Sequence, residues 1–456
     1  MQCREVCYRV QRMNPIGTAS SSHRQVWLLA GPIILSNIST PLVGAVDTAV
    51  VGHLPDPSSI GAVALGALIF SFIYWSFGFL RMGTTGFIAR AVGAGDPRAF
   101  SETLLRVILL ASVFGVVTIL LGYPIIALAL YLVDGSLRVE ALAADYAGIR
   151  IWSAPATLCV YVFTGIFIGM HNTRRVFALQ LLLNLTNVFL DLVFVIGFGL
   201  GVEGVAWATL IAEYLAAIAG FYLLRGPIRD ALQSCTPDRL LDRSAMVALM
   251  RANGDIFIRT LCLTFCFAWF TAEGAGFGEV ILAANAILMH FQSFAAYGLD
   301  GFAHAAEAMA GSAYGARDRA AFKRTVRATT FWGLLTAIFI SLVYLFFGSG
   351  LINLFSDLET VRSTAQVYLP WVVALPLVSI WSFQLDGIFI GTGHSREMRN
   401  AMIVTTAAYL AAMSQLAPWL GNHGLYLGLY VLMLLRALTL LYYYPAITSM
   451  MSESRV

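Results

Sequence analysis

The chain has 456 residues, of which 59% are hydrophobic and only 12% are charged, with a net charge of +3. Soluble domains carry about 25% charged residues, so this composition argues against a soluble enzyme or a nucleic-acid-binding protein. Apolar runs of about 20 residues, long enough to span a bilayer, recur from end to end. The sequence therefore predicts an all-α polytopic membrane protein whose main surroundings are the lipid bilayer.

We predict twelve membrane-spanning helices. Basic residues gather in alternate loops, which by the positive-inside rule predicts cytoplasmic termini, here in a plasma (inner) membrane. The polar loop 225–245 divides the spans six and six. The expected spans are 27–51, 60–89, 104–132, 143–169, 176–197, 203–224, 246–272, 281–312, 326–350, 364–391, 400–419 and 424–447. The expected domains are a tail at 1–26, a lobe at 27–225, a linker at 226–245, a lobe at 246–447 and a tail at 448–456. Met1 and Met13 are both possible starts.

The two halves of the chain repeat each other. Residues 163–169 (F-T-G-I-F-I-G) match residues 385–391 (L-D-G-I-F-I-G), 222 residues further on. The same spacing relates Tyr146 to Tyr368 and residues 93–96 to 315–318. A duplicated unit of six spans inserts both copies in the same direction, which predicts two pseudo-symmetric six-helix bundles with a cavity between them.

Polar residues interrupt the apolar span at 176–197. Asn184, Asn187 and Asp191 are spaced i, i+3 and i+7, so they share one face of a helix. A carboxylate in hydrocarbon costs at least ~2.5 kcal/mol unless a partner, an ion or a polar cavity receives it. The face that contains Asp191 is therefore the first candidate for a functional site.

Other spans place polar side chains at a similar depth. Counted along the predicted spans at ~1.5 Å per residue, Asp47, Asp191 and Thr209 lie within ~10 Å of the outer boundary. Asn187 and Glu213 lie about one turn deeper. Equal depth on three spans favours a site where these groups converge. The alternative interpretation is that the buried carboxyls only join helices by hydrogen bonds.

Several blocks of sequence are distinctive. They are P-L-V-G-A-V-D-T-A-V-V-G-H-L at 41–54, the segment 201–214, D-I-F-I-R-T at 255–260, A-A-N-A-I-L at 283–288 and the repeat at 385–391. These blocks resemble the multidrug and toxic compound extrusion (MATE) family, and in particular its DinF-like branch. The resemblance implies two six-helix bundles around a V-shaped central cavity. It also implies efflux of a drug-like, often cationic, small organic molecule in exchange for H⁺ or Na⁺, without a cofactor. We expect a monomer.

The resemblance further implies that Asp47, Asn187, Asp191 and Thr209 bind the coupling cation. Two neighbouring carboxylates in a low dielectric cannot both ionise cheaply, so one is expected to hold a proton. Oxygens of the same cluster are also ligands for a dehydrated Na⁺. Our hypothesis is that protonation of Asp47 or Asp191 switches the first lobe between two shapes, with H⁺ preferred over Na⁺.

The second half has its own intramembrane charges. Asp255 and Arg259 are spaced i, i+4 and are expected to pair along one helix. Asp300, His304 and Glu307 share a face of the next span. We interpret these residues as a structural network between Arg259 and carboxylates.

An alternative coupling set lies in the second lobe. It consists of Asp300, Glu307 and Asp386, the last of which occupies the repeat position of Thr164. Arg81 is expected either to join the network of the second half or to face Glu307 from the other lobe.

A drug-binding cavity needs aromatic and methionine surface with a few polar groups. The sequence offers Tyr161, Met170, Asn285, Met289, Gln292, Phe294, Tyr297 and Trp381. No Walker motif, zinc spacing or nucleophile–base set indicates an enzyme. The leading prediction is a secondary antiporter. An exporter of an organic anion such as citrate, a flippase for lipid-linked precursors, an intramembrane enzyme and a channel are the alternatives.

Overall fold

The computed structural model of the chain describes residues 19–52, 58–132 and 136–451. The expected tails at 1–26 and 448–456 therefore lie outside the described residues, apart from 19–26 and 448–451. Within the described part the regular elements are all helices, so the predicted all-α fold class is confirmed. Eleven of these helical segments are long and apolar enough to cross a membrane. The helix α2 precedes them at the position of the first predicted span.

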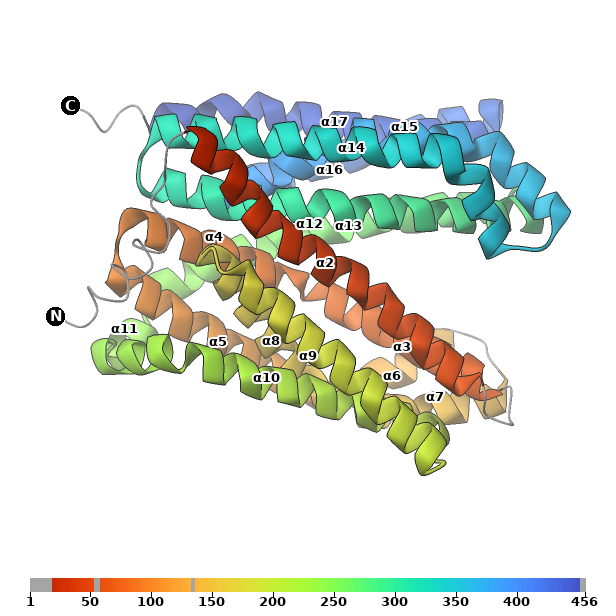
Figure 1. Cartoon of the computed structure of the whole chain (residues 1–456), viewed down its shortest axis with the longest axis horizontal. Helices are drawn as coiled ribbons and strands as arrows, with labels where there is room; N and C mark the ends of the chain where they lie inside the picture. The colour runs from red at the N-terminus through yellow and green to blue at the C-terminus, as the bar shows by residue number, and fades with distance from the viewer. Residues whose placement is uncertain (1–18, 53–57, 133–135, 452–456) are drawn as a thin grey trace. The chain divides into compact units, whose positions relative to one another are not determined.

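The first half of the chain forms helices α2 to α10 (Figure 1). Their bounds are α2 Ala19–Val51, α3 Ser58–Ser76, α4 Gly78–Ala94, α5 Pro97–Leu120, α6 Gly122–Leu132, α7 Leu137–Arg150, α8 Ala154–Gly169, α9 Thr173–Asp191 and α10 Gly201–Ser234. The second half forms α11 Pro237–Leu240, α12 Arg243–Ala275, α13 Glu279–Gly315, α14 Arg319–Phe355, α15 Glu359–Thr392, α16 Ser395–Leu420 and α17 Asn422–Met450.

Several predicted spans of the first half are broken helices. The span at 60–89 is interrupted at Phe77, between α3 and α4. A 3₁₀ turn, Ile151–Ser153, separates α7 from α8 directly before Pro155, a residue that has no N–H for a helical hydrogen bond. A π-helix, Leu192–Gly197, follows Asp191 at the end of α9. By contrast, α10 continues past Pro227 to Ser234, and α11 and the start of α12 follow closely, so most of the segment expected as a linker is helical.

The bounds of the helices follow the sequence repeat. The helix α9 begins at Thr173 and α16 at Ser395, 222 residues later. A glycine with positive φ precedes the last helix of each half, Gly199 at +67° and Gly421 at +55°. Only glycine enters this backbone region cheaply. Both copies thus place a glycine that needs this backbone region at the same repeat position.

The chain forms two compact units. One comprises Leu35–Leu249, and the other comprises α2 up to Ile34 together with the chain from Met250 onward. The first part of α2 contributes Val26 and Leu29 to a buried cluster with Phe302. Its second part, which contains Asp47, belongs to the first unit. One helix thus supplies side chains to both units.

The repeated G-I-F-I-G motif is a helix-packing motif. A Cβ at Gly387 would lie 2.2 Å from the carbonyl oxygen of Ala303, so α15 touches the backbone of α13. In the first unit, a Cβ at Gly165 would lie 2.5 Å from the carbonyl oxygen of Arg81, so α8 touches α4 in the same way. Small residues at such contacts let membrane helices approach closely.

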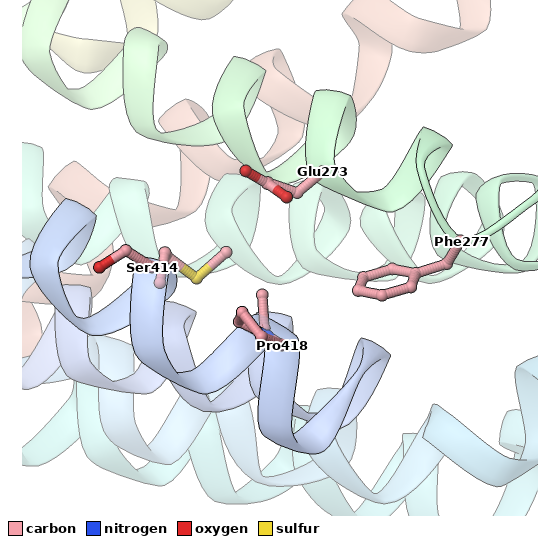
Figure 2. A pocket seen from close by; sticks show the side chains of 6 residues that line it. Glu273, Phe277, Ser414 and Pro418 are labelled. Carbon is pink, nitrogen blue, oxygen red and sulfur yellow. The ribbon is translucent and has the colours of Figure 1, made fainter.

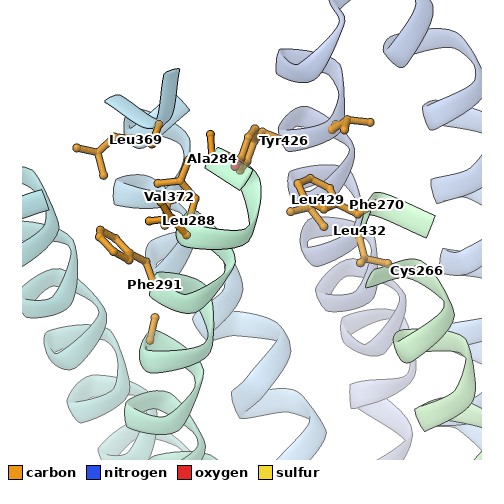
Figure 3. Packing of buried hydrophobic residues seen from close by; sticks show 14 of the residues in the cluster. Cys266, Phe270, Ala284, Leu288, Phe291, Leu369, Val372, Tyr426, Leu429 and Leu432 are labelled. Carbon is orange, nitrogen blue, oxygen red and sulfur yellow. The ribbon is translucent and has the colours of Figure 1, made fainter. Parts of the chain in front are cut away.

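A core of the second unit lies between helices α12 to α17 (Figure 3). Phe270 packs edge-on against Tyr426, with 5.4 Å between ring centroids. The hydroxyl of Tyr344 donates to the carbonyl oxygen of Phe291 at 2.7 Å, and that of Tyr409 donates to the carbonyl oxygen of Cys266 at 3.2 Å. Each buried hydroxyl thereby finds an acceptor, which buried polar groups need.

Candidate functional site

The polar face of α9 is buried in the first unit. Asn184, Asn187 and Asp191 have exposed fractions of 6%, 1% and 0%, although many of their apolar neighbours on α9 are more exposed. Asn184 donates to Ser39 Oγ of α2 at 2.8 Å, and Asn187 donates to Thr209 Oγ1 of α10 at 3.1 Å. The i, i+3, i+7 face therefore contacts two different helices.

The carboxyls of Asp47 and Asp191 lie within hydrogen-bonding reach of each other. Asp191 ends α9 just before the widened π-helical turn, and Asp47 lies on α2. Two ionised carboxylates cannot donate to one another, so the bond between them forms only when one holds a proton. Two acids from separate spans are thus adjacent.

These two acids and Asn187 present acceptor atoms without donors. Among the described residues, no group donates a hydrogen bond to either carboxylate oxygen of Asp191, to Oδ1 of Asp47 or to Oδ1 of Asn187. Buried acceptors are rarely left in this condition. Four oxygens without donors fit a site that receives a proton or a small hard cation, the kind of ion that prefers oxygen ligands.

A second network surrounds Arg150, which ends α7. Its Nη1 lies 3.2 Å from Oε1 of Glu213 on α10 and donates to Ser153 Oγ at 3.0 Å. The other carboxylate oxygen of Glu213 accepts a hydrogen bond from Thr157. The hydroxyl of Tyr74 lies 2.9 Å from Ser153 Oγ. Glu213, which the sequence placed one turn deeper than the acid pair, is therefore a partner of Arg150.

Arg150 also acts on the acid pair. Its guanidinium lies 5.2 Å from the ring centroid of Phe70, and it is close enough for its positive charge to attract the carboxylate of Asp47. One buried guanidinium therefore interacts with two acids: it forms an ion pair with Glu213 and attracts Asp47 electrostatically. Arg81, on α4, exerts its charge on Tyr161 in the same unit.

Asp386 is the centre of the charged network in the second unit. One of its oxygens accepts hydrogen bonds from both Arg259 of α12 and Arg436 of α17. The side chains of all three residues are at most 8% exposed. Two guanidinium groups thus converge on one carboxylate from two other helices.

The expected pairing of Asp255 with Arg259 along α12 is wrong. Asp255 forms an ion pair with Arg399 of α16, with 2.6 Å between Oδ1 and Nη1, and accepts from Ser395 Oγ at 3.1 Å. Arg259 binds Asp386. Partners on other helices compete with the i, i+4 neighbour, and sequence spacing alone does not reveal them. Further along, His304 and Glu307 of α13 lie 3.6 Å apart.

The residues expected to line a drug cavity have varied surroundings. Asn285 exchanges hydrogen bonds with Asn422 at 2.7 and 2.9 Å and accepts from Tyr426 at 2.9 Å. It therefore joins α13 to α17. Gln292 is buried, whereas Phe294 and Trp381 are 44% and 43% exposed. Tyr161, Met170, Met289 and Tyr297 are partly exposed.

Two arginines of these networks were not predicted from the sequence. Neither Arg150 nor Arg436 was predicted as a site residue. Both lie inside apolar segments that we had drawn as spans, 143–169 and 424–447. An intramembrane arginine implies a partner, and this signal would have pointed to Glu213 and Asp386.

Two repeated helical units with buried acids inside membrane-spanning helices define the class of the protein: a multi-pass membrane transporter. A family model described as MatE matches residues 32–193 and 256–415. The chain belongs to this family, that of the multidrug and toxic compound extrusion (MATE) transporters, which are not enzymes. The resemblance to this family is thus confirmed.

The chain is 42% identical over 423 residues to DNA damage-inducible protein F of Escherichia coli (strain K12), and the match covers 92% of each chain. It is 25% identical over 419 residues to a probable multidrug resistance protein NorM of Caulobacter vibrioides, with 89% and 86% coverage. Its fold matches an outward-facing conformation of a multidrug resistance MATE family transporter with a TM-score of 0.85, 19% identity and coverage of 95% and 97%. By homology the chain is thus a membrane transporter of the MATE family.

Proposed function

We propose that the chain is a secondary antiporter that exports drug-like organic cations or amphipathic compounds in exchange for H⁺. Asp47 and Asp191 share the coupling proton in this proposal, and Asn187 and Thr209 hold α9 against α10 beside them. The observation that carries the proposal is the approach of the two carboxyls, with four buried oxygens that lack a described donor.

The proton cycle follows from electrostatics. A protonated pair is held together by one hydrogen bond and carries a single negative charge, which the field of Arg150 offsets in part. Loss of the proton leaves two adjacent negative charges, which repel each other in a low dielectric. The pair then separates, α2 moves relative to α9, and the lobe changes between its substrate-holding and substrate-releasing shapes.

Sodium is the second candidate for the coupling ion, because the same four oxygens are hard ligands. Organic anions such as citrate remain the alternative substrate class. We further propose a monomer in the inner membrane with both termini in the cytoplasm. This orientation rests on the basic residues of alternate loops.

The test is transport in proteoliposomes that contain the full chain. A fluorescent organic cation is followed under an imposed pH gradient, an imposed Na⁺ gradient, or neither, and radiolabelled citrate is followed in parallel. We expect export of the cation to follow the pH gradient. Export under the Na⁺ gradient alone would show that Na⁺, and not H⁺, is the coupling ion. Transport of citrate without transport of the cation would show that the substrates are organic anions.

A further inference from the structure

The second unit contains a groove that the site in the first unit does not use. It lies between the end of α12 and α16 and has a volume of about 360 Å³ (Figure 2). Pockets for drug-sized ligands occupy about 300–1,000 Å³, so the groove is large enough for a small organic molecule. Its lining residues are Glu273, Phe277, Met413, Ser414, Ala417 and Pro418.

The lining combines one carboxylate and one hydroxyl, that of Ser414, with apolar groups. Glu273 is the single charged residue among the six, and it forms no ion pair with a residue in the described part of the chain. Phe277 supplies an aromatic ring, and Met413, which is 1% exposed, closes the groove from the side of the core. These groups favour a cation with a large apolar body, which gains from contact with the ring as well as from the carboxylate.

The repeat places this groove at the counterpart of the acid pair. A shift of 222 residues brings Asp191 onto Met413, and it brings Asp47 onto Trp269, one helical turn before Glu273. The helices α12 and α16 are the copies of α2 and α9. Each unit therefore has a carboxylate at the same junction of two helices, but the second unit has a methionine where the first has a buried acid.

This difference changes the cation that each junction suits. A proton or a bare metal ion suits several oxygens close together, as at Asp47 and Asp191. At the groove, one carboxylate and the hydroxyl of Ser414 stand beside a ring and a proline, so a small inorganic ion would find fewer oxygen ligands than at the acid pair. An organic monocation is neutralised by the carboxylate and buries its apolar surface on the remaining residues.

We propose that the groove is a binding site for an organic monocation with aromatic or alkyl substituents, with Glu273 as its counter-charge. The choice of ligand rests on the proposed function, because such cations are the compounds that the antiporter is proposed to export. The site itself rests on the groove, on Glu273 and on the repeat.

The test is equilibrium binding of tetraphenylphosphonium to the purified full chain. We expect Glu273→Gln to weaken binding about tenfold, a change equivalent to one lost charge interaction. The control is Glu279→Gln, since Glu279 is exposed at the start of α13, and it should bind as the unchanged protein does. Equal binding by Glu273→Gln, or no binding by the unchanged protein, overturns the proposal.

Two further measurements keep the outcome clear if Glu273→Gln folds poorly. A photoreactive aryl cation should label peptides that contain Phe277 or residues 413–418, and excess tetraphenylphosphonium should suppress this labelling; labelling elsewhere alone overturns the proposal. Ser414→Phe, at an exposed position of the lining, should fill the groove and reduce the same labelling. If binding depends on Glu273 but no export follows a pH gradient, the binding site is supported and the proposed antiport is refuted. If export follows a pH gradient but Glu273→Gln binds as the unchanged protein does, only the proposed binding site is refuted.

Discussion

Arg150 and Glu213 form a buried ion pair in the first unit, with 3.2 Å between Nη1 and Oε1. The pair joins the end of α7 to α10, and Arg150 also acts on Asp47 of α2. A single guanidinium thus connects the acid pair to a third carboxylate through electrostatics. This relationship leads to the first prediction.

Removing one member of the pair should be costlier than removing both. Glu213→Gln leaves the Arg150 cation without its neutralising partner in a dry interior, which costs ~3–5 kcal/mol of stability. The double variant Arg150→Met with Glu213→Leu should have an unfolding temperature closer to that of the unchanged protein than Glu213→Gln has. Thermal unfolding in detergent measures all three. If the single variant is as stable as the unchanged protein, water reaches the pair and it is not buried as described.

Asp191→Asn should abolish export driven by a pH gradient and leave the protein folded. The amide keeps the shape of the carboxyl but cannot exchange a proton, so the pair loses its two states. Asp47→Asn should behave alike. The measurements are transport in proteoliposomes and proton release by the purified protein when substrate is added. Glu203→Gln is the matched control, because Glu203 is exposed at the start of α10. Full proton-coupled export by Asp191→Asn would exclude this acid as the coupling group.

The sequence contains enough information for the plan of the fold and for part of the site. The spacing of Asn184, Asn187 and Asp191 placed them on one face, because helical geometry alone decides that. The spacing of residues in the sequence could not predict the partners of Arg150 and Arg436. Contacts between helices depend on the rotation and tilt of each helix, which spacing does not encode. For the same reason the pairing of Asp255 was assigned to its helical neighbour, whereas the structure gives it to Arg399.

Asp386→Asn should destabilise the second unit. The variant leaves Arg259 and Arg436 facing one another around a neutral amide, at a cost of ~3–5 kcal/mol. Adding Arg436→Met should recover part of the loss, since one positive charge is removed. Asp255→Asn is the control, because its partner Arg399 is 29% exposed. Water can solvate Arg399 when the pair is lost, so the loss of stability should be about 1 kcal/mol. Unfolding temperature and yield are measured. If Asp386→Asn is stable but does not transport, the coupling carboxyl belongs to the second unit.

Asn285→Ala should weaken the protein without changing the compounds that it binds. Asn285 exchanges two hydrogen bonds with Asn422 and accepts a third from Tyr426. Interhelical hydrogen bonds in membrane proteins contribute ~0.6 kcal/mol each on average, so the loss is about 1–2 kcal/mol. Thermal unfolding and affinities for a set of organic cations are compared. Altered affinities at unchanged stability would instead indicate that Asn285 lines the drug cavity, as the sequence predicted.

The close approach of α15 to α13 gives the sharpest packing prediction. In Gly387→Ala, the new methyl group would meet the carbonyl oxygen of Ala303 at 2.2 Å. Backbone cannot yield as a flexible side chain does, so α15 must move away and the unfolding temperature should fall. Gly165→Ala, the repeat counterpart, should act alike against the carbonyl oxygen of Arg81 at 2.5 Å. Gly350→Ala is the control: its Cβ meets nothing within 4 Å, and alanine gains up to ~1 kcal/mol over glycine within a helix. Unchanged unfolding of Gly387→Ala would mean that these two helices lie further apart.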